Sequence, residues 1–376
     1  MKHGWKENRV EDCLEKVVYT NKIKRKDFLN QGDFPIISQE QDFINGYWND
    51  SSDLFIIKKP VIIFGDHTRV LKYVDFNFVL GADGVKILQP RESFHPKFFY
   101  YFLQSKEFKN LGYARHYRLL RDFLVPLPPL PEQRRIVAIL DEAFAAIAKA
   151  KENTEKNLQN ARELFQSFLQ SVFANPGDEW ELKQLVEVCE KITDGTHVTP
   201  HYLPKGIPFL SVKNLTKGFI DFSDTKYISK EEHQFLTKSY RPEKNDLLYT
   251  KVGTTGIAKV VDTNIEFSIF VSIALLKLKH DLIFNKYLEY FLNSPYAREQ
   301  AKKRTRGTAN KNLVISDIKE IKIHFPKSLN NQQSIVTKLD TLSTGTQKLE
   351  ATYRQKLADL EELRQLFLRK AFEGEL

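Results

Sequence analysis

Cysteine is scarce in this sequence, and its scarcity argues against two kinds of cysteine-based structure. The 376 residues include two cysteines, Cys13 and Cys189, which stand far apart and form no Cys-x-x-Cys pair. A disulfide framework or a cysteine-rich zinc site needs more thiols at closer spacing. The sequence therefore predicts neither, and both thiols are expected to be buried or idle in a reducing compartment.

Long apolar runs are also absent. No stretch approaches the 18 apolar residues that a membrane-spanning helix requires. The first residues, MKHGWKENRVEDC, lack the apolar centre of a secretory signal peptide. We therefore expect a soluble, cytoplasmic protein with no membrane contact.

Motifs for catalysis are missing in the same way. The chain contains neither Asn/Asp-Pro-Pro-Tyr/Phe nor Phe-x-Gly-x-Gly, the signatures expected of an adenine methyltransferase. Tyr249–Gly256 has small residues that could bring backbone N–H groups close to a phosphate, but it lacks the spacing of a nucleotide-binding loop. Asp194–His197, DGTH, has no Ser, Cys or second carboxylate at a supporting spacing. A stand-alone nuclease or methylase is therefore disfavoured, and we expect no catalytic, cofactor-binding or metal-binding residues in this chain.

The charge balance favours a polyanionic partner. Lysine and arginine number 57 against 48 aspartate and glutamate, which gives a net charge of +9. The 28 Phe and 15 Tyr are in many places interleaved with the basic residues. This composition suits nucleic-acid binding, although a merely basic soluble protein would show the same balance.

The clearest structural signal is a long helix. It begins at LPPLPEQ, Leu127–Gln133, where Pro131 suits a first helical turn because its missing N–H costs nothing there. No further Pro or Gly occurs until Asn175-Pro176-Gly177. Between these points two rows of positions repeat every seven residues, as in a helix that packs on a partner helix. The rows are Leu140, Ile147, Thr154, Ala161 and Phe168, and Phe144, Lys151, Leu158, Phe165 and Val172.

The helix occurs twice. Ile136 matches Ile335 and Asp141 matches Asp340, both at an offset of 199 (335 − 136; 340 − 141). The register holds without a gap to Phe173 and Phe372, which indicates two copies of one unit. The simplest arrangement packs the two helices on each other; two unrelated solvent-exposed helices are the alternative.

The remaining segments form a second repeat. Short apolar runs separated by Gly, Asp and Asn in the first 126 residues predict strands and tight turns, followed by helical spacing over Phe94–Ser105. Pro35 corresponds to Pro208 and Phe98 to Tyr287, so the offset grows from 173 (208 − 35) to 189 (287 − 98). The second copy therefore carries insertions in its loops, which suggests that the two copies have similar functions but act on different targets.

The predicted fold is α+β with an internal pseudo-twofold repeat. Two globular domains, each a twisted β-sheet with short helices, span residues 1–129 and 176–329. Two long helices, residues 130–175 and 330–376, would pair as an antiparallel coiled coil. Antiparallel pairing would place the globular domains at opposite ends, where they could grip two separated half-sites of twofold-symmetric DNA with the helix pair as a ruler.

Basic segments and small-residue turns supply the candidate DNA contacts. A basic segment follows the helical spacing in each copy, Arg115–Arg121 and Lys302–Lys311, and we take the two as equivalent. The turn at Phe64–Arg69 is taken as equivalent to Tyr249–Gly256. Solvated charge runs and a purely structural turn at Asp194–His197 are the alternatives. The predicted contacts are His67, Thr68, Arg69, Arg115, His116, Arg118, Arg121, Thr196, His197, Lys251, Thr254, Thr255, Lys302, Lys303, Arg304, Arg306, Asn310 and Lys311.

The chain resembles the specificity (S) subunit of type I restriction-modification systems over essentially its whole length. The resemblance is most specific in LPPLPEQRRIVAILD, Leu127–Asp141, and in ITDGTHVTPHYLPKGIPFLSVKNL, Ile192–Leu215. The entry of the second helix, PKSLNNQQ, departs from the Leu-Pro-x-x-Glu-Gln form usual in that family.

The resemblance implies two target recognition domains that each read one half of a bipartite site in double-stranded DNA. It also implies two methyltransferase (M) subunits that dock on the coiled coil and bind S-adenosylmethionine, and restriction (R) subunits that use ATP and Mg²⁺. The S chain itself would be non-catalytic. The competing hypothesis is a coiled-coil protein-interaction scaffold whose basic surfaces are incidental.

Overall fold

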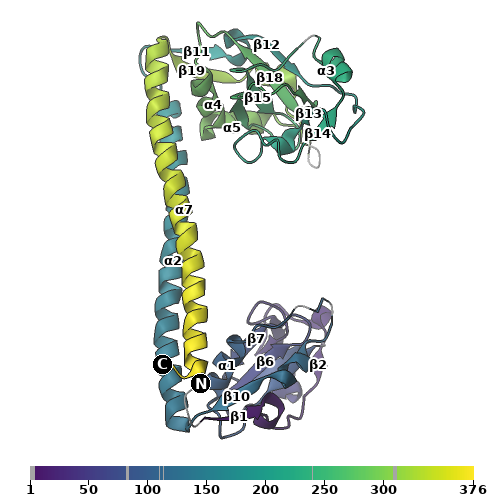
Figure 1. Cartoon of the computed structure of the whole chain (residues 1–376), viewed down its shortest axis with the longest axis vertical. Coiled ribbons are helices and arrows are strands. Elements are labelled where there is room, and N and C mark those ends of the chain that lie inside the picture. Colours follow the sequence, from purple (N-terminus) through teal and green to yellow (C-terminus); the bar gives the residue numbers. More distant parts are fainter. Residues whose placement is uncertain (1–4, 82–83, 110, 113, 239, 308–310) are drawn as a thin grey trace. The chain divides into compact units, whose positions relative to one another are not determined.

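The computed structural model describes residues 5–81, 84–109, 111–112, 114–238, 240–307 and 311–376 (Figure 1). The chain folds into two compact units. Unit 1 comprises Met1–Glu155 with Arg354–Leu376, and unit 2 comprises Lys156–Tyr353. Each unit thus contains one globular part together with a portion of each long helix.

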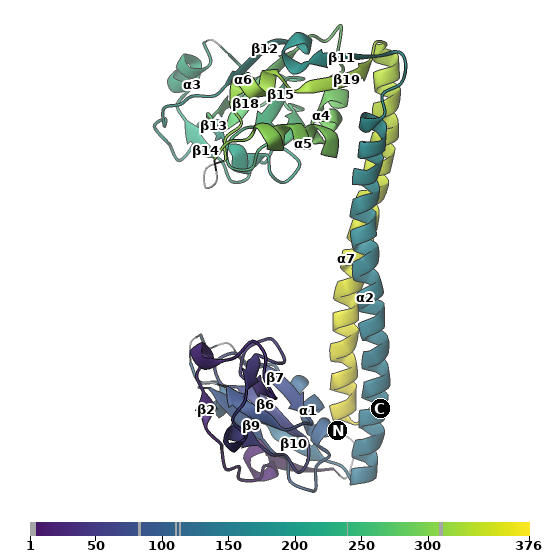
Figure 2. The same ribbon diagram turned by 180° about the vertical axis from the view of Figure 1, so that it is seen from behind.

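The two long helices are α2 (Leu130–Ala174) and α7 (Leu329–Glu373), each of 45 residues. In unit 1 the beginning of α2 packs antiparallel to the end of α7: the Arg364 guanidinium lies 4.9 Å from the ring centre of Phe144. In unit 2 the end of α2 packs on the beginning of α7, with Arg162 and Glu350 paired at 3.2 Å. The antiparallel coiled coil is confirmed, and helices α2 and α7 can be followed in Figure 2.

Three of the ten predicted seam positions are buried, six are partly buried and one is exposed. Leu140, Thr154 and Ala161 are at most 5% exposed, while Lys151 points to solvent. Thr154 satisfies its buried hydroxyl by donating to the carbonyl of Ala150, one turn back, at 2.7 Å. A polar residue in the seam is therefore accommodated without an unpaired group.

The described residues of unit 1 form three small sheets. Strands β1 (Lys6–Arg9) and β10 (Leu124–Leu127) form an antiparallel pair. A mixed sheet and an antiparallel sheet complete the set, in the orders β2-β8-β3-β4 with β5 on β8, and β7-β6-β9. Their bounds are β2 Lys22–Ile23, β3 Phe34–Ile37, β4 Gly46–Trp48, β5 Leu54–Phe55, β6 Val61–Gly65, β7 Leu71–Val74, β8 Phe78–Gly81 and β9 Val85–Leu88.

In the described part of unit 1, one α-helix and four 3₁₀ turns connect these strands. Helix α1 spans Pro96–Gln104 with Pro96 in its first turn, as the sequence predicts. The 3₁₀ turns are η1 (Val10–Cys13), η2 (Arg25–Asp27), η3 (Ser51–Asp53) and η4 (Tyr117–Asp122). The aromatic face of α1 is buried because Phe98, Phe99 and Phe102 pack into the core beside α2 and α7.

Unit 2 repeats this plan. Its antiparallel pair is β11–β19, and its sheets have the orders β14-β13-β17 and β12-β18-β15-β16. The strands are β11 Trp180–Gln184, β12 Cys189–Asp194, β13 Ile207–Leu210, β14 Lys226–Ile228, β15 Leu247–Thr250, β16 Ala258–Val260, β17 Ser268–Ile269, β18 Ile273–Leu278 and β19 Lys322–Pro326. The helices are η5 (Leu185–Val188), η6 (Val212–Asn214), α3 (Lys230–Leu236), α4 (Asn285–Asn293), α5 (Pro295–Arg304) and α6 (Ile315–Lys319).

The strand pairings confirm the predicted repeat. Pro35 lies in β3 and Pro208 in β13, and each of these strands pairs antiparallel with the next strand and parallel with a later one. Helix α4 corresponds to α1, with Tyr287 in the place of Phe98. Helices α3 and α5 have no counterpart among the described residues of unit 1, which accounts for the growing offset.

Both cysteines are free and buried, as predicted. Burial raises the pKa of the Cys13 thiol and of the Cys189 thiol to about 12, so both stay protonated and unreactive near neutral pH. None of the helices in the described part of the chain is long and apolar enough to cross a membrane.

Candidate nucleic-acid interface

The turn that joins β6 to β7 in unit 1 is held to the segment that leads into η4 by hydrogen bonds, which are called the tie below. Asp66, which is 2% exposed, accepts the backbone N–H of Tyr117 on Oδ1 at 2.7 Å. Its backbone carbonyl accepts the N–H of His116 at 2.7 Å. The structure therefore brings His67–Arg69 next to the basic segment at Arg115–Arg121, two stretches that lie far apart in the sequence.

His116 is part of this tie and is not available to DNA. The side chain is fully buried, and Nε2 accepts the N–H of Leu111 at 3.1 Å. Nδ1 then carries the proton and lies 3.0 Å from the carbonyl oxygen of Asp66. Burial and the use of both ring nitrogens inside the fold argue against the predicted contact of His116 with DNA.

The other predicted contacts of unit 1 reach the surface to different degrees. Arg115 and Arg118 are exposed and have no acidic partner among the residues that the structure describes, whereas Arg121 pairs with Glu11. Thr68 is exposed, but its hydroxyl donates to the carbonyl of Gln39 at 2.6 Å.

His67 and Arg69 are each partly exposed. Arg69 has a left-handed backbone (φ 64°), and its guanidinium donates to the carbonyl of Phe108 at 3.1 Å. Arg115 and Arg118 are therefore the freest cations of this cluster.

Unit 2 builds the same tie with different residues. The carbonyl of Lys251, directly after β15, accepts the N–H of Leu313 at 2.7 Å, and Gly253 donates its N–H to Lys311 at 2.9 Å. The hydroxyls of Thr255 and Thr305 lie 3.2 Å apart. The loop between β15 and β16 is thereby held against the end of α5, so exposed Thr254 and partly exposed Thr255 lie near the basic residues there.

The Asp194–His197 turn joins this loop through an ion pair. Asp194 Oδ2 accepts the Lys251 ammonium at 2.6 Å and lies 3.3 Å from His197 Nε2. Lys251 is only 5% exposed and its charge is neutralised by Asp194, which argues against the predicted contact of Lys251 with DNA. His197 is exposed and Thr196 partly exposed, and both remain predictions.

Gly195 makes this turn possible. An added Cβ would lie 1.9 Å from the carbonyl oxygen of Ile269, a distance that no real carbon tolerates. The close approach lets Thr196 donate its N–H to Ile269 and accept the N–H of Val271. The turn is therefore fixed by backbone contacts.

The two basic segments are equivalent only in part, which corrects the prediction made from their sequence positions. Arg115–Arg121 lies in and before η4, whose counterpart by position is α6. Lys302, Lys303 and Arg304 instead form the last turn of α5, a helix found only in unit 2 among the residues described. The two units therefore present their positive charge from different elements.

Within the second cluster, Lys302 and Lys311 are exposed, and Lys303 lies 3.8 Å from Glu299. Arg304 is partly exposed and donates to the carbonyl of Gln300 at 3.2 Å. Arg306 is exposed and pairs with Asp317 at 3.0 Å. Asn310, the remaining predicted contact, lies outside the described residues.

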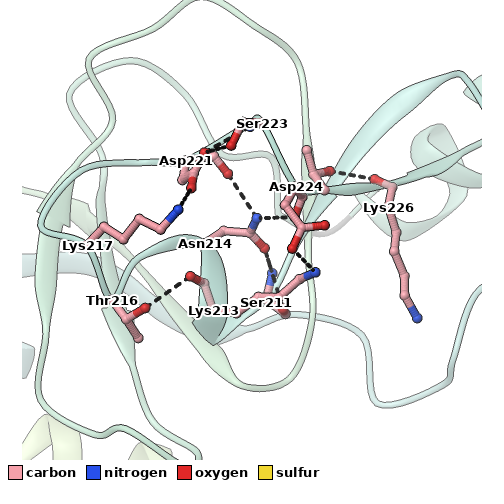
Figure 3. A network of polar contacts seen from close by, with 10 residues as sticks. Ser211, Lys213, Asn214, Thr216, Lys217, Asp221, Ser223, Asp224 and Lys226 are labelled. Atoms are coloured by element: carbon pink, nitrogen blue, oxygen red, sulfur yellow. Dashed lines mark hydrogen bonds and ion pairs between the residues drawn. The ribbon is translucent and has the colours of Figure 1, made fainter. Parts of the chain in front are cut away.

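Sequence reasoning missed a loop, residues 211–226, that starts beside this surface. Val212 donates its N–H to the hydroxyl of Ser272, whose carbonyl accepts the N–H of Lys251. The loop folds around buried Asn214, which accepts the N–H of Ser211 and donates to the carbonyls of Asp221 and Asp224 (Figure 3).

Two lysines of this loop, Lys213 and Lys217, are already paired. Lys213 lies 3.1 Å from Asp224, and Lys217 lies 2.7 Å from Asp221 (Figure 3). The Lys217 ammonium and the Ser223 hydroxyl hold the pKa of the Asp221 carboxyl well below its usual range. In unit 1, Asn45 accepts the N–H of Ser38 in the same way. The signal that could have predicted this loop from the sequence is therefore an Asn that follows the strand, β3 in unit 1 or β13 in unit 2.

No group of three or more His, Cys, Asp or Glu side chains that could hold a metal ion occurs among the described residues. The surface that the structure assembles in each unit is thus a tied turn beside a basic segment. Such a surface can bind a phosphate backbone and present side chains to base edges.

Comparison with known proteins agrees with this architecture. The family described as "Type I restriction modification DNA specificity domain" matches residues 2–158 and 177–359. The specificity subunit of the type I restriction enzyme EcoBI of Escherichia coli is 25% identical over 372 residues, covering 88% of this chain and 75% of that protein. The EcoR124I/EcoR124II specificity subunit of Escherichia coli is 26% identical over 356 residues, covering 87% and 83%.

Two solved structures share the fold. A chain from a study of complex assembly and conformational transition in the type I R-M system has a TM-score of 0.77 at 19% identity, covering 100% of this chain and 99% of that chain. The HsdS subunit from Thermoanaerobacter tengcongensis has a TM-score of 0.59 at 20% identity, covering 100% and 98%. At this level of identity the likeness concerns the fold.

Proposed function

The chain belongs to the family of type I restriction-modification DNA specificity domains, and on that basis we propose that it is the DNA sequence-specificity subunit of a type I restriction-modification complex. The observation that carries the proposal is the duplicated surface. In each unit a strand ends in a turn whose backbone carbonyl binds the segment following the helix, which places a turn and a cluster of cations together. Two such surfaces in one chain suit a bipartite DNA site.

The two kinds of side chain at each surface would do different work. Exposed cations such as Arg115 and Arg118, or Lys302 and Lys311, would neutralise phosphates and set the position of the unit on the duplex. Side chains of the turns, such as Thr68 and His197, would approach base edges, where each good bidentate contact discriminates by about 1–3 kcal/mol. Because the two DNA-binding surfaces belong to one chain, binding of the second half-site is effectively intramolecular once the first is bound, and the overall affinity for DNA rises.

The chemistry would come from partners. As a member of this family the chain is part of a restriction-modification complex, and we propose two methyltransferase subunits as its direct partners on the coiled coil. They would bind S-adenosylmethionine, while restriction subunits would use ATP and Mg²⁺. The chain itself would be non-catalytic and would act in the cytoplasm.

The helix pair would act as the ruler between half-sites. Deleting four residues, about one turn, from the Lys149–Asn160 stretch of α2 together with the equivalent four from Lys348–Asp359 of α7 shortens both helices equally and keeps the two copies in register with each other. We expect the unspecified gap in the methylated site to change while both half-site sequences stay the same. Sequencing of methylated DNA from cells that express the variant with its methylating subunit measures both.

A matched control exchanges four exposed residues of the same stretch for alanine without changing its length, and its gap should equal that of the wild type. An unchanged gap in a folded deletion variant would contradict the ruler. A coiled-coil scaffold, the alternative function, predicts no gapped methylation site for the wild type and binding to DNA with little sequence selectivity.

A further inference from the structure

A buried glutamine in the first turn of α2 connects three segments of unit 1. Gln133 is fully buried, and its Nε2 donates to the carbonyls of Ser93 and Pro128, both at 2.9 Å. Its Oε1 accepts the N–H of His95 at 2.7 Å. One side chain thus ties the long helix to the loop before α1 and to the residue that follows β10.

Unit 2 repeats the arrangement at the start of α7. Gln332 is fully buried and lies 199 residues after Gln133 (332 − 133). Nε2 donates to the carbonyls of Leu282 at 3.0 Å and Pro326 at 2.9 Å, and Oε1 accepts the N–H of Phe284 at 2.8 Å. All three bonds go to the equivalent places, although PKSLNNQQ and LPPLPEQ share little sequence.

A second bond follows two turns later in both helices. Tyr101 of α1 donates its hydroxyl to Asp141, and Tyr290 of α4 donates to Asp340 at 2.5 Å. Burial, together with the bonded carboxylate, raises the pKa of both phenols, so both keep their proton at any physiological pH. Both aspartates lie eight residues after the glutamine of their helix (141 − 133; 340 − 332).

The opposite helix completes the contact. In unit 1 the Phe372 ring, near the end of α7, lies 5.1 Å from that of Phe98 on α1. In unit 2 the Phe173 ring, near the end of α2, lies 5.5 Å from that of Tyr287 on α4. Each globular part is therefore held by the first turns of one long helix and the last turns of the other.

We propose that these contacts form a rigid joint that fixes the angle of each DNA-reading part on the helix pair, so that the joint, together with helix length, determines the permitted gap between half-sites. Gln133, Tyr101 and Asp141 form the joint of unit 1, and Gln332, Tyr290 and Asp340 that of unit 2. These are positioning residues, since none of them belongs to the surface proposed to contact DNA. The inference rests on the proposed function.

The physical reason is that a helix pair of fixed length sets a fixed gap between half-sites only if the DNA-reading parts cannot rotate on it. Hydrophobic packing alone is non-directional and tolerates small rotations, whereas three hydrogen bonds from one planar amide define an orientation. Both copies retain the bonds although the sequences around them differ.

The test uses Gln332→Glu in the complete complex with the methylating subunit. A carboxylate cannot donate to the carbonyls of Leu282 and Pro326, so the joint loses two bonds while its shape is kept. Methylation rates are measured on DNA in which the two half-sites are separated by every gap within a few base pairs of the native one. We expect the preference for the native gap over its neighbours to fall by about tenfold, with both half-site sequences unchanged.

Gln333→Glu is the matched control, because it makes the same change at an exposed neighbouring position and should keep the native preference. Tyr290→Phe removes a single hydroxyl and decides the question if Gln332→Glu does not fold. A folded variant of either kind with the wild-type gap preference would overturn the proposal. Failure of the proposed function shows separately, as a wild-type complex that methylates no gapped site.

Discussion

Replacing Gly195 with alanine is expected to abolish reading of the second half-site. The added Cβ would lie 1.9 Å from the carbonyl oxygen of Ile269, so the turn and β17 must move apart. That movement breaks the bonds through which Thr196 holds this edge of unit 2, and the cost is expected to exceed about 3 kcal/mol. Thermal unfolding of the purified chain and methylation by the assembled complex measure the two consequences.

Gly345 provides the control for this substitution. It lies within α7, and an added Cβ there meets no atom within 4 Å. Alanine at this position should leave the chain as stable as before or stabilise it by up to about 1 kcal/mol, because alanine is the better helix former. A Gly195→Ala chain that melts like the wild type and still directs methylation at both half-sites would show that the turn does not depend on this close approach.

Neutralising Lys302, Lys303 and Lys311 together is expected to weaken DNA binding by roughly 10²-fold at about 0.1 M salt. Removing one phosphate contact reduces the slope of log K against log salt by about 0.9, so removing three should reduce it by about 3. Sequence preference should stay the same, because phosphate contacts carry no sequence information. Titration of labelled DNA with the complex between about 50 and 200 mM salt measures the slope, with all three lysines changed to glutamine.

The control removes the same net charge elsewhere. Lys149, Lys151 and Lys156 are exposed on α2, outside the surface assembled in unit 2. Changing these three to glutamine should leave the salt slope close to that of the wild type. Equal slopes for the two triple variants would mean that net charge, and not the cluster at α5, governs binding.

The long helices and the repeat could be predicted from sequence because their signals are periodic. A seven-residue apolar phase, bounded by Pro131 and by Asn175-Pro176-Gly177, marks a helix without reference to the rest of the fold. The correspondence of Pro35 with Pro208 identified two strands that pair with equivalent strands in the two units. These features depend on local pattern and on counting, both of which a sequence contains.

The candidate site was harder to predict because it depends on contacts between distant segments. His116 and Lys251 read as basic residues of exposed loops, yet their partners, Asp66 and Asp194, lie 50 and 57 residues away. The basic segments were taken as equivalent because both follow a helix; only the fold reveals that the second segment begins inside α5, a helix that follows α4 and has no counterpart among the described residues of unit 1. Charge shows that a surface is basic, but it does not show which cations are already paired.

The glutamine joint illustrates the same limit. Gln133 stands in a recognisable sequence, LPPLPEQ, whereas Gln332 stands in PKSLNNQQ, beside another glutamine. The ungapped offset of 199 pairs Gln332, and not Gln333, with Gln133, but only the fold shows that Gln332 is buried and Gln333 exposed. Equivalent partners then follow from the duplicated fold.

The most direct test of the central claim is sequencing of methylated DNA from cells that express this chain with its methylating subunit, beside cells that lack the chain. The account predicts a new methylated motif made of two short specified blocks separated by a gap of fixed length. Methylation of a single continuous block, or no chain-dependent motif in cells where the assembled complex is present and its methylating subunit is competent, would contradict it.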